Sequence, residues 1–121
     1  MNLLIALVAL SGLATYYSPG LMETVAANRG MPLDGYAGGV ALNDCEHLGR
    51  SVWLEWEDGD IEGPFLVVDC AQQRHVGARD ARGYVAEVDA SVAKEHGFYG
   101  VGPVPCSVWF EQPPAGMPRA Y

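Results

Sequence analysis

Residues 51–70, SVWLEWEDGDIEGPFLVVDC, carry the clearest structural signal in this chain of 121 residues. Side chains alternate in the first six residues, which predicts a half-buried strand with Val52, Leu54 and Trp56 on its core face. Glu55 then falls on the face toward solvent. The acidic turn EDGD follows, and the apolar run FLVVDC is typical of a second strand, so we expect a hairpin that ends close to Asp69.

The composition extends this β pattern to the whole chain. The 15 glycines and 8 prolines favour many turns, and 50% hydrophobic residues suffice for the core of one domain. We expect a helix over 89–96, capped by Asp89 or Ser91, with Asp89 favoured, and stopped by Gly97, whereas 22–28 fits either a short helix or a loop. The expected strands cover 12–17, 39–42, 51–56, 65–70, 84–88 and part of 101–110.

The charge and the motifs exclude several classes of partner. A net charge of -8 repels phosphate backbones, so nucleic acid is not expected to bind. No cysteine pair has CxxC spacing and the three histidines are scattered, so no metal site is expected. No Gly-rich phosphate loop joins a strand to a helix, and we therefore expect no nucleotide or other cofactor.

The N-terminus begins with an unbroken apolar run, residues 3–10. It is too short for a stable membrane span but has the length of a signal-peptide hydrophobic region, with Ala9 and Ser11 at −3 and −1 of a cut before Gly12. No Lys or Arg precedes the run, so a buried strand or helix is the alternative. We divide the chain into an apolar N-terminal segment, 1–11, a folded domain, 12–111, and a proline-rich tail, 112–121.

Pieces of the chain, taken in order, resemble the rare-lipoprotein-A-like double-psi β-barrel family, which is related to expansin and barwin barrels. GLATYYSPG at 12–20 is similar to the family's opening Gly-x-Ala-Ser-Tyr-Tyr strand, and Ala27-Asn28 falls at its Thr-Ala-Asn-Gly stretch. ALNDCEHLGRSVWL at 41–54 resembles the segment with Leu-Gly and a Val-rich strand. VVD at 67–69 resembles Val-x-Asp-Arg-Gly, and VDASVAKEHGFYGVGPVPCSV at 88–108 resembles the closing helix and strand.

The resemblance implies a mainly β fold, a six-stranded double-psi β-barrel with one or two short helices. It also implies an exported domain, extracellular or at the cell envelope, that binds a cell-wall polysaccharide such as peptidoglycan or acts like a lytic transglycosylase. Two departures leave the enzymatic activity open. Asn43 stands where the family often has a His, and Cys70-Ala71-Gln72 replaces the family's Arg-Gly-Pro.

Asp69 is the candidate general acid, because the resemblance places it at the groove and four apolar residues precede it. Partial desolvation at the end of a core strand favours the protonated carboxyl group, which donates to a glycosidic oxygen. The alternative is a structural acid that accepts main-chain N–H bonds. A hydrolase needs a second carboxylate, for which Glu23 and Asp44 are the candidates.

The candidate substrate-binding residues are Tyr17, Glu23, Asn43 and Asp44. Tyr17 adjoins the turn at 18–20, where its flat ring is suited to stack on a sugar. For Asn43 a turn residue is the favoured interpretation, and for Glu23 a solvated acid.

The three cysteines allow one disulfide and one free thiol. The resemblance brings the loops that hold Cys45 and Cys70 together at the groove and so implies a Cys45–Cys70 bridge. The alternatives are three reduced thiols in a cytosolic protein, and a catalytic cysteine, for which no His is placed by sequence. A non-catalytic structural or interaction barrel in a larger surface or virion assembly is the alternative function, with the N-terminus and tail as contacts to a protein partner.

Overall fold

The computed structural model describes residues 9–71 and 83–114, so the predictions for 1–8, 72–82 and 115–121 lie outside the described residues. The elements in chain order are β1 (Ala9–Tyr16), α1 (Leu21–Asn28), β2 (Gly38–Leu42), the 3-10 helix η2 (Cys45–His47), β3 (Ser51–Trp56), β4 (Ile61–Cys70), β5 (Tyr84–Val88), α3 (Ala90–Glu95) and β6 (Val104–Trp109).

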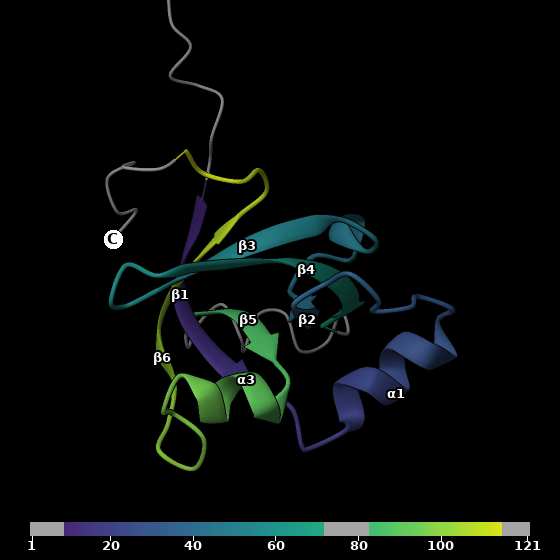
Figure 1. The fold of residues 1–121 in the computed structure, drawn as a ribbon, viewed down its shortest axis with the longest axis horizontal. Coiled ribbons are helices and arrows are strands. Elements are labelled where there is room, and N and C mark those ends of the chain that lie inside the picture. The colour runs from purple at the N-terminus through teal and green to yellow at the C-terminus, as the bar shows by residue number, and fades with distance from the viewer. Residues whose placement is uncertain (1–8, 72–82, 115–121) are drawn as a thin grey trace, which may run out of the picture.

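The strands close into a mixed barrel in the order β1-β5-β2-β4-β3-β6, with the helices at its periphery (Figure 1). The pairs β1–β5 and β2–β4 are parallel, and the other neighbours are antiparallel. The predicted hairpin over 51–70 is the antiparallel pair β3–β4. The predicted fold class, a mainly β six-stranded barrel with short helices, is therefore confirmed.

Branched apolar side chains from facing strands fill the interior of the barrel. Val40 of β2, Val52 of β3, Val67 of β4 and Val88 of β5 are all 0% exposed and belong to one core cluster. Burial of each such side chain contributes about 1.5–3 kcal/mol to folding. The predicted core face of β3 is confirmed, since the side chains that alternate with Trp53 and Glu55 are all buried.

The helix α1 packs on the outside of the barrel rather than in its interior. Met22 and Ala26, one turn apart on α1, cluster with Leu66 and Val68 of β4. This contact explains why 22–28 is a helix, the alternative that the sequence left open, because its apolar face has a partner on the sheet. The packing also brings the C-terminal end of α1, with Arg29, toward the end of β4.

Glu55 does not face solvent as the alternation in β3 predicted. Its residue is only 2% exposed, and the indole Nε1 of Trp109 in β6 donates a hydrogen bond of 3.0 Å to its carboxylate. The prediction was wrong because β3 is paired on both edges in a closed barrel, and the neighbouring strand supplies both cover and a donor.

The first strand begins three residues before the boundary that the sequence suggests. Ala9, Leu10 and Ser11 pair with β6, and the Ser11 and Ser107 hydroxyls lie 2.8 Å apart. A signal-peptide cleavage before Gly12 would therefore remove residues that are paired in the barrel.

Candidate functional site

Asp69 lies near the end of β4, where the strand changes from buried to accessible. Val67 and Val68 before it are 0% exposed, whereas the Asp69 side chain is 19% exposed. Ala41 of β2 is its partner in the parallel pair β2–β4, directly after an irregularity in the register. The carboxylate is thus held by a rigid strand but remains open to a ligand.

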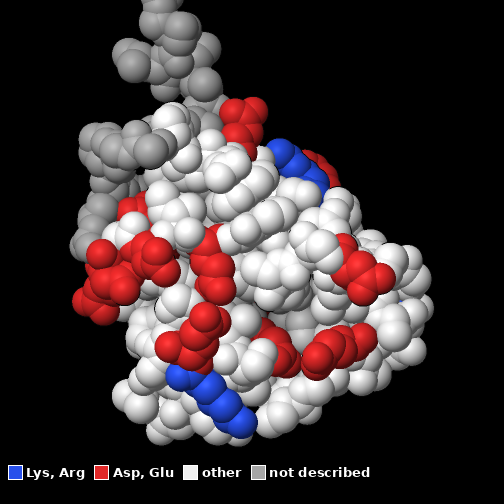
Figure 2. Space-filling model, viewed as in Figure 1, with Lys and Arg blue, Asp and Glu red and all other residues white. Residues whose placement is uncertain are grey.

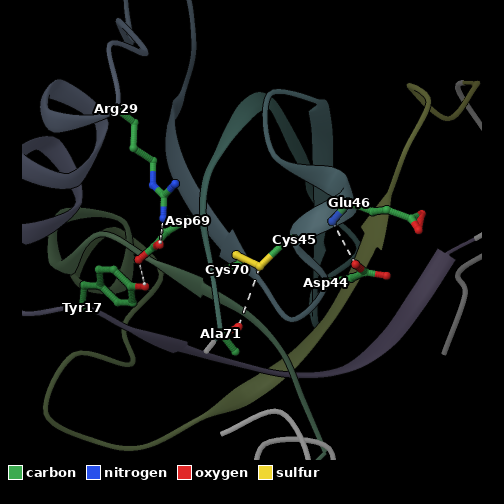
Figure 3. The surroundings of a disulfide bond; sticks show 8 residues. All are labelled: Tyr17, Arg29, Asp44, Cys45, Glu46, Asp69, Cys70 and Ala71. Carbon is green, nitrogen blue, oxygen red and sulfur yellow. Dashed lines mark hydrogen bonds and ion pairs between the residues drawn. A yellow bond between two sulfur atoms is a disulfide. The ribbon is translucent and has the colours of Figure 1, made fainter. Parts of the chain in front are cut away.

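Two side chains from other elements converge on this carboxylate (Figure 3). The Tyr17 hydroxyl donates to Asp69 Oδ2 at 2.7 Å, and Arg29 Nη2 donates to Asp69 Oδ1 at 3.0 Å. The Arg29 side chain is 40% exposed, so its guanidinium also reaches solvent. We name Tyr17, Arg29 and Asp69 the Asp69 cluster.

Main-chain hydrogen bonds hold both donor residues, Tyr17 and Arg29, in position. The Tyr17 amide donates to the carbonyl of Val88 at the end of β5, at 2.8 Å. Arg29 is the C-cap of α1, and its amide donates to the carbonyl of Val25 at 3.1 Å. Among the described residues, no main-chain amide donates to Asp69, so its described partners are the side chains of Tyr17 and Arg29.

The predicted Cys45–Cys70 disulfide is present and joins η2 to the end of β4. It ties together the loop that carries Asp44 and the strand that carries Asp69, because each acid directly precedes one of the bridged cysteines. In Figure 3 the Asp69 cluster lies on one side of the bridge and Asp44 with Glu46 on the other. Asp44 accepts a hydrogen bond of 2.9 Å from the Glu46 amide and so caps η2.

A groove of about 520 Å³ lies on the Asp44 side of the barrel. It contains two of the predicted substrate-binding residues, Asn43 and Asp44, but not Asp69. The side-chain Nδ2 of Asn43 also donates to the main-chain carbonyl of Tyr84 at 3.1 Å, which anchors the loop after β2 to the start of β5. The other lining residues are Ala9, Leu10, Ser11, Leu42, His47, Gly83, Tyr84 and Val85.

Glu23 lies in neither the Asp69 cluster nor this groove. It is an exposed residue in the first turn of α1 and lines a different, smaller cavity of about 230 Å³ beside Asp89 and Ser91. Asp89 caps α3 as the sequence predicted, with its carboxylate accepting from the Ser91 amide at 2.9 Å.

Sequence reasoning missed two charged residues near Asp69. Arg29 was not singled out, because it lies 40 residues from Asp69 in sequence and no motif links the two. Glu87 of β5 and Asp69 of β4 are both in register with Ala41, one on either side of β2. An acid that interrupts the strand pattern YVAEV was the only signal for Glu87.

The free cysteine of the described chain is unsuited to nucleophilic chemistry. Cys106 is 0% exposed in the core, and burial, together with the charge of Glu55, raises the pKa of its thiol to about 12. A nucleophilic cysteine requires the thiolate and access to substrate. The site therefore rests on the polar side chains at the surface.

Acidic side chains are spread over the face of the molecule shown in Figure 2, with few basic ones among them. This agrees with the net charge of -8. In the described part of the chain, none of the helices has the length and hydropathy to cross a bilayer.

No protein-family model matches the sequence, and no curated protein matches it significantly. In structure the chain is similar to the apo form of an expansin from Clavibacter michiganensis, with a TM-score of 0.55 and 20% sequence identity. The likeness covers 90% of this chain but 53% of the expansin chain, so this chain spans about half the length of that protein. The chain therefore has the barrel fold of the expansin type, as the pieces between residues 12 and 110 predicted.

Proposed function

We propose that this protein is an extracellular barrel that binds a cell-wall polysaccharide through the Asp69 cluster. The observation that carries the proposal is the convergence of Tyr17, directly after β1, Arg29, directly after α1, and Asp69 of β4 at one partly exposed point. The expansin-type fold supports it, since the family resemblance points to glycan surfaces.

The cluster offers the groups that recognise sugars. A carboxylate and a guanidinium form hydrogen bonds to hydroxyl groups that are stronger than those between neutral partners. The Tyr17 ring adds a flat surface of the kind on which sugar rings stack. Across the disulfide, Asn43 and Asp44 in the groove extend the polar surface that a linear chain is able to follow.

The net charge of the chain indicates which ligands to expect, and the disulfide bond indicates where the protein is located. A net charge of -8 disfavours polyanionic glycans, so a neutral polysaccharide or the glycan strand of peptidoglycan is the expected ligand. The Cys45–Cys70 bridge is typical of proteins in oxidising compartments, which supports an extracellular or cell-envelope location.

Binding without cleavage is the activity that the geometry supports best. A general acid must donate a proton to the glycosidic oxygen, but both carboxylate oxygens of Asp69 already accept hydrogen bonds, Oδ2 from Tyr17 at 2.7 Å and Oδ1 from Arg29 at 3.0 Å. Of the two candidates for a second carboxylate, Asp44 lies across the disulfide and Glu23 lines a different cavity. Cleavage by a lytic-transglycosylase-like route would require a bound sugar to displace Arg29 from Asp69.

A pull-down on insoluble peptidoglycan, cellulose and chitin tests the proposal. Asp69→Asn and Arg29→Gln should each weaken retention about 10-fold or more, because each loses a hydrogen bond to a charged group. Asp60→Asn is the matched control, since this exposed acid precedes β4 and lies roughly 30 Å along the strand from Asp69. Circular dichroism verifies that the variants are folded.

Two results would overturn the proposal. Retention of Asp69→Asn and Arg29→Gln equal to that of the wild type would remove the cluster from the binding surface. No retention of the wild type on any of the glycans would favour the interaction barrel instead. Release of anhydro-sugar products by the wild type, and loss of this release in Asp69→Asn, would instead identify the domain as a lytic transglycosylase.

A further inference from the structure

A second polar cluster lies at the opposite end of β4 from the Asp69 cluster. Glu62 is near the start of this strand, roughly 20 Å from Asp69 along it. Its Oε1 is 2.9 Å from Nε2 of His96, the C-cap of α3. One ligand atom from each of Glu62, Glu95 and His96 falls within 4.8 Å of the others.

Trp56 orients two members of this cluster. Its indole stacks on the His96 ring with a centroid distance of 4.3 Å and an interplanar angle of 26°. Its Nε1 also donates to Glu62 Oε1 at 3.1 Å. Trp56 is only 3% exposed, so it is a rigid support for both groups. Metal sites use such outer contacts to fix the orientation of their ligands.

Apart from His96, no basic side chain among the described residues pairs with the two carboxylates of the cluster, Glu62 and Glu95. Lys94, the neighbour of Glu95 on α3, lies over the Tyr99 ring instead, with Nζ 4.8 Å from its centroid. Two carboxylates this close repel each other unless a cation lies between them.

We propose that Nε2 of His96 and the carboxylates of Glu62 and Glu95 bind a divalent transition-metal ion of the zinc class. Imidazole and carboxylate groups are ligands of such ions, and a tetrahedral site places ligand atoms roughly 3.4 Å apart, so small shifts of the side chains complete the site. A cavity of about 330 Å³, lined by Trp56, Glu57, Asp58, His96 and Val104, adjoins it and gives access to water.

The sequence predicted no metal site, because the three ligands show no motif spacing. Glu95 and His96 are adjacent at the end of α3, but Glu62 lies 34 residues from His96 in the chain. Only the closure of the barrel brings the start of β4 to the end of α3. This site is independent of the glycan-binding proposal.

Titration calorimetry with ZnCl₂ on the full, disulfide-bonded chain without a polyhistidine tag tests the site. We expect one Zn²⁺ per chain. His96→Gln, Glu62→Gln and Glu95→Gln should each weaken the affinity about 10-fold or more. Asp58→Asn is the matched control: it removes an acidic charge from the adjoining cavity without removing a ligand, and should change the affinity by no more than about 2-fold.

Glu95→Gln is the decisive variant, because Glu95 is exposed and we expect its substitution to leave the fold intact. Unchanged Zn²⁺ affinity in this variant and in His96→Gln would overturn the proposal and place the metal on other carboxylates. The absence of saturable Zn²⁺ uptake by the wild type would overturn it as well. A tryptophan fluorescence change on Zn²⁺ addition that is lost in Glu95→Gln and kept in Asp58→Asn would locate the bound ion at this cluster.

Discussion

Removal of the Cys45–Cys70 disulfide should destabilise the barrel by an amount that depends on the length of the loop it closes. The two cysteines are 25 residues apart, and the loss of loop-closure entropy on linking them is about 11.7 cal/mol/K, or about 3.5 kcal/mol at 25 °C. For a domain of this size, 1 kcal/mol corresponds to about 4 °C in melting temperature. The variant Cys45→Ala/Cys70→Ala should therefore melt about 14 °C below the oxidised wild type.

Urea unfolding followed by circular dichroism measures this difference. The single variant Cys45→Ala should lose nearly as much free energy of unfolding as the double variant, because either change opens the same bridge. Wild type treated with reductant should match both. Additive effects of the two single variants, or a double variant within about 1 kcal/mol of the oxidised wild type, would refute the reasoning from loop closure.

Two further predictions concern the core and the closure of the barrel. With its pKa raised to about 12, the buried Cys106 thiol should resist an aromatic disulfide reagent in the native chain. Urea without reductant should expose one thiol, and reduction should expose three. In the unfolded chain the thiol has its ordinary pKa of 9.0, whereas in the folded chain its pKa is about 12. The free energy of unfolding should therefore fall as the pH rises from 9.0 toward 12. A free energy of unfolding that stays constant over this pH range would contradict the prediction. Gly12→Ala would place a Cβ 2.4 Å from the carbonyl oxygen of Gly83. This clash separates β1 from β5 and should lower the free energy of unfolding by about 1–3 kcal/mol. An unchanged melting temperature would contradict this expectation.

Most of the fold was predictable because its signals are local. The alternation in SVWLEW, the turn EDGD and the Asp89 cap each depend on residues a few positions apart, and each appears in the structure where the sequence places it. Element boundaries were less predictable. The strand β1 starts at Ala9, inside an apolar run whose composition is equally typical of a signal peptide.

The polar sites were predictable only in part. Asp69 was singled out from the resemblance and Tyr17 from its place beside the turn at 18–20, and the structure places the Tyr17 hydroxyl 2.7 Å from Asp69 Oδ2. Arg29 was not singled out, because a helix end gives no indication of which strand it will meet. The burial of Glu55 was missed for a similar reason: its donor, Trp109, lies 54 residues away on a strand that becomes a neighbour only in the closed barrel.

The sequence by itself determined the strands, the helix cap and, through family resemblance, the disulfide that joins Cys45 to Cys70. Periodicity and turn residues act over a few positions, so these features are present in the chain before it folds. Tertiary structure alone decided which polar side chains meet, Arg29 with Asp69 and Glu62 with His96. The physical reason is that such contacts depend on the register and closure of the strands, which no local pattern encodes.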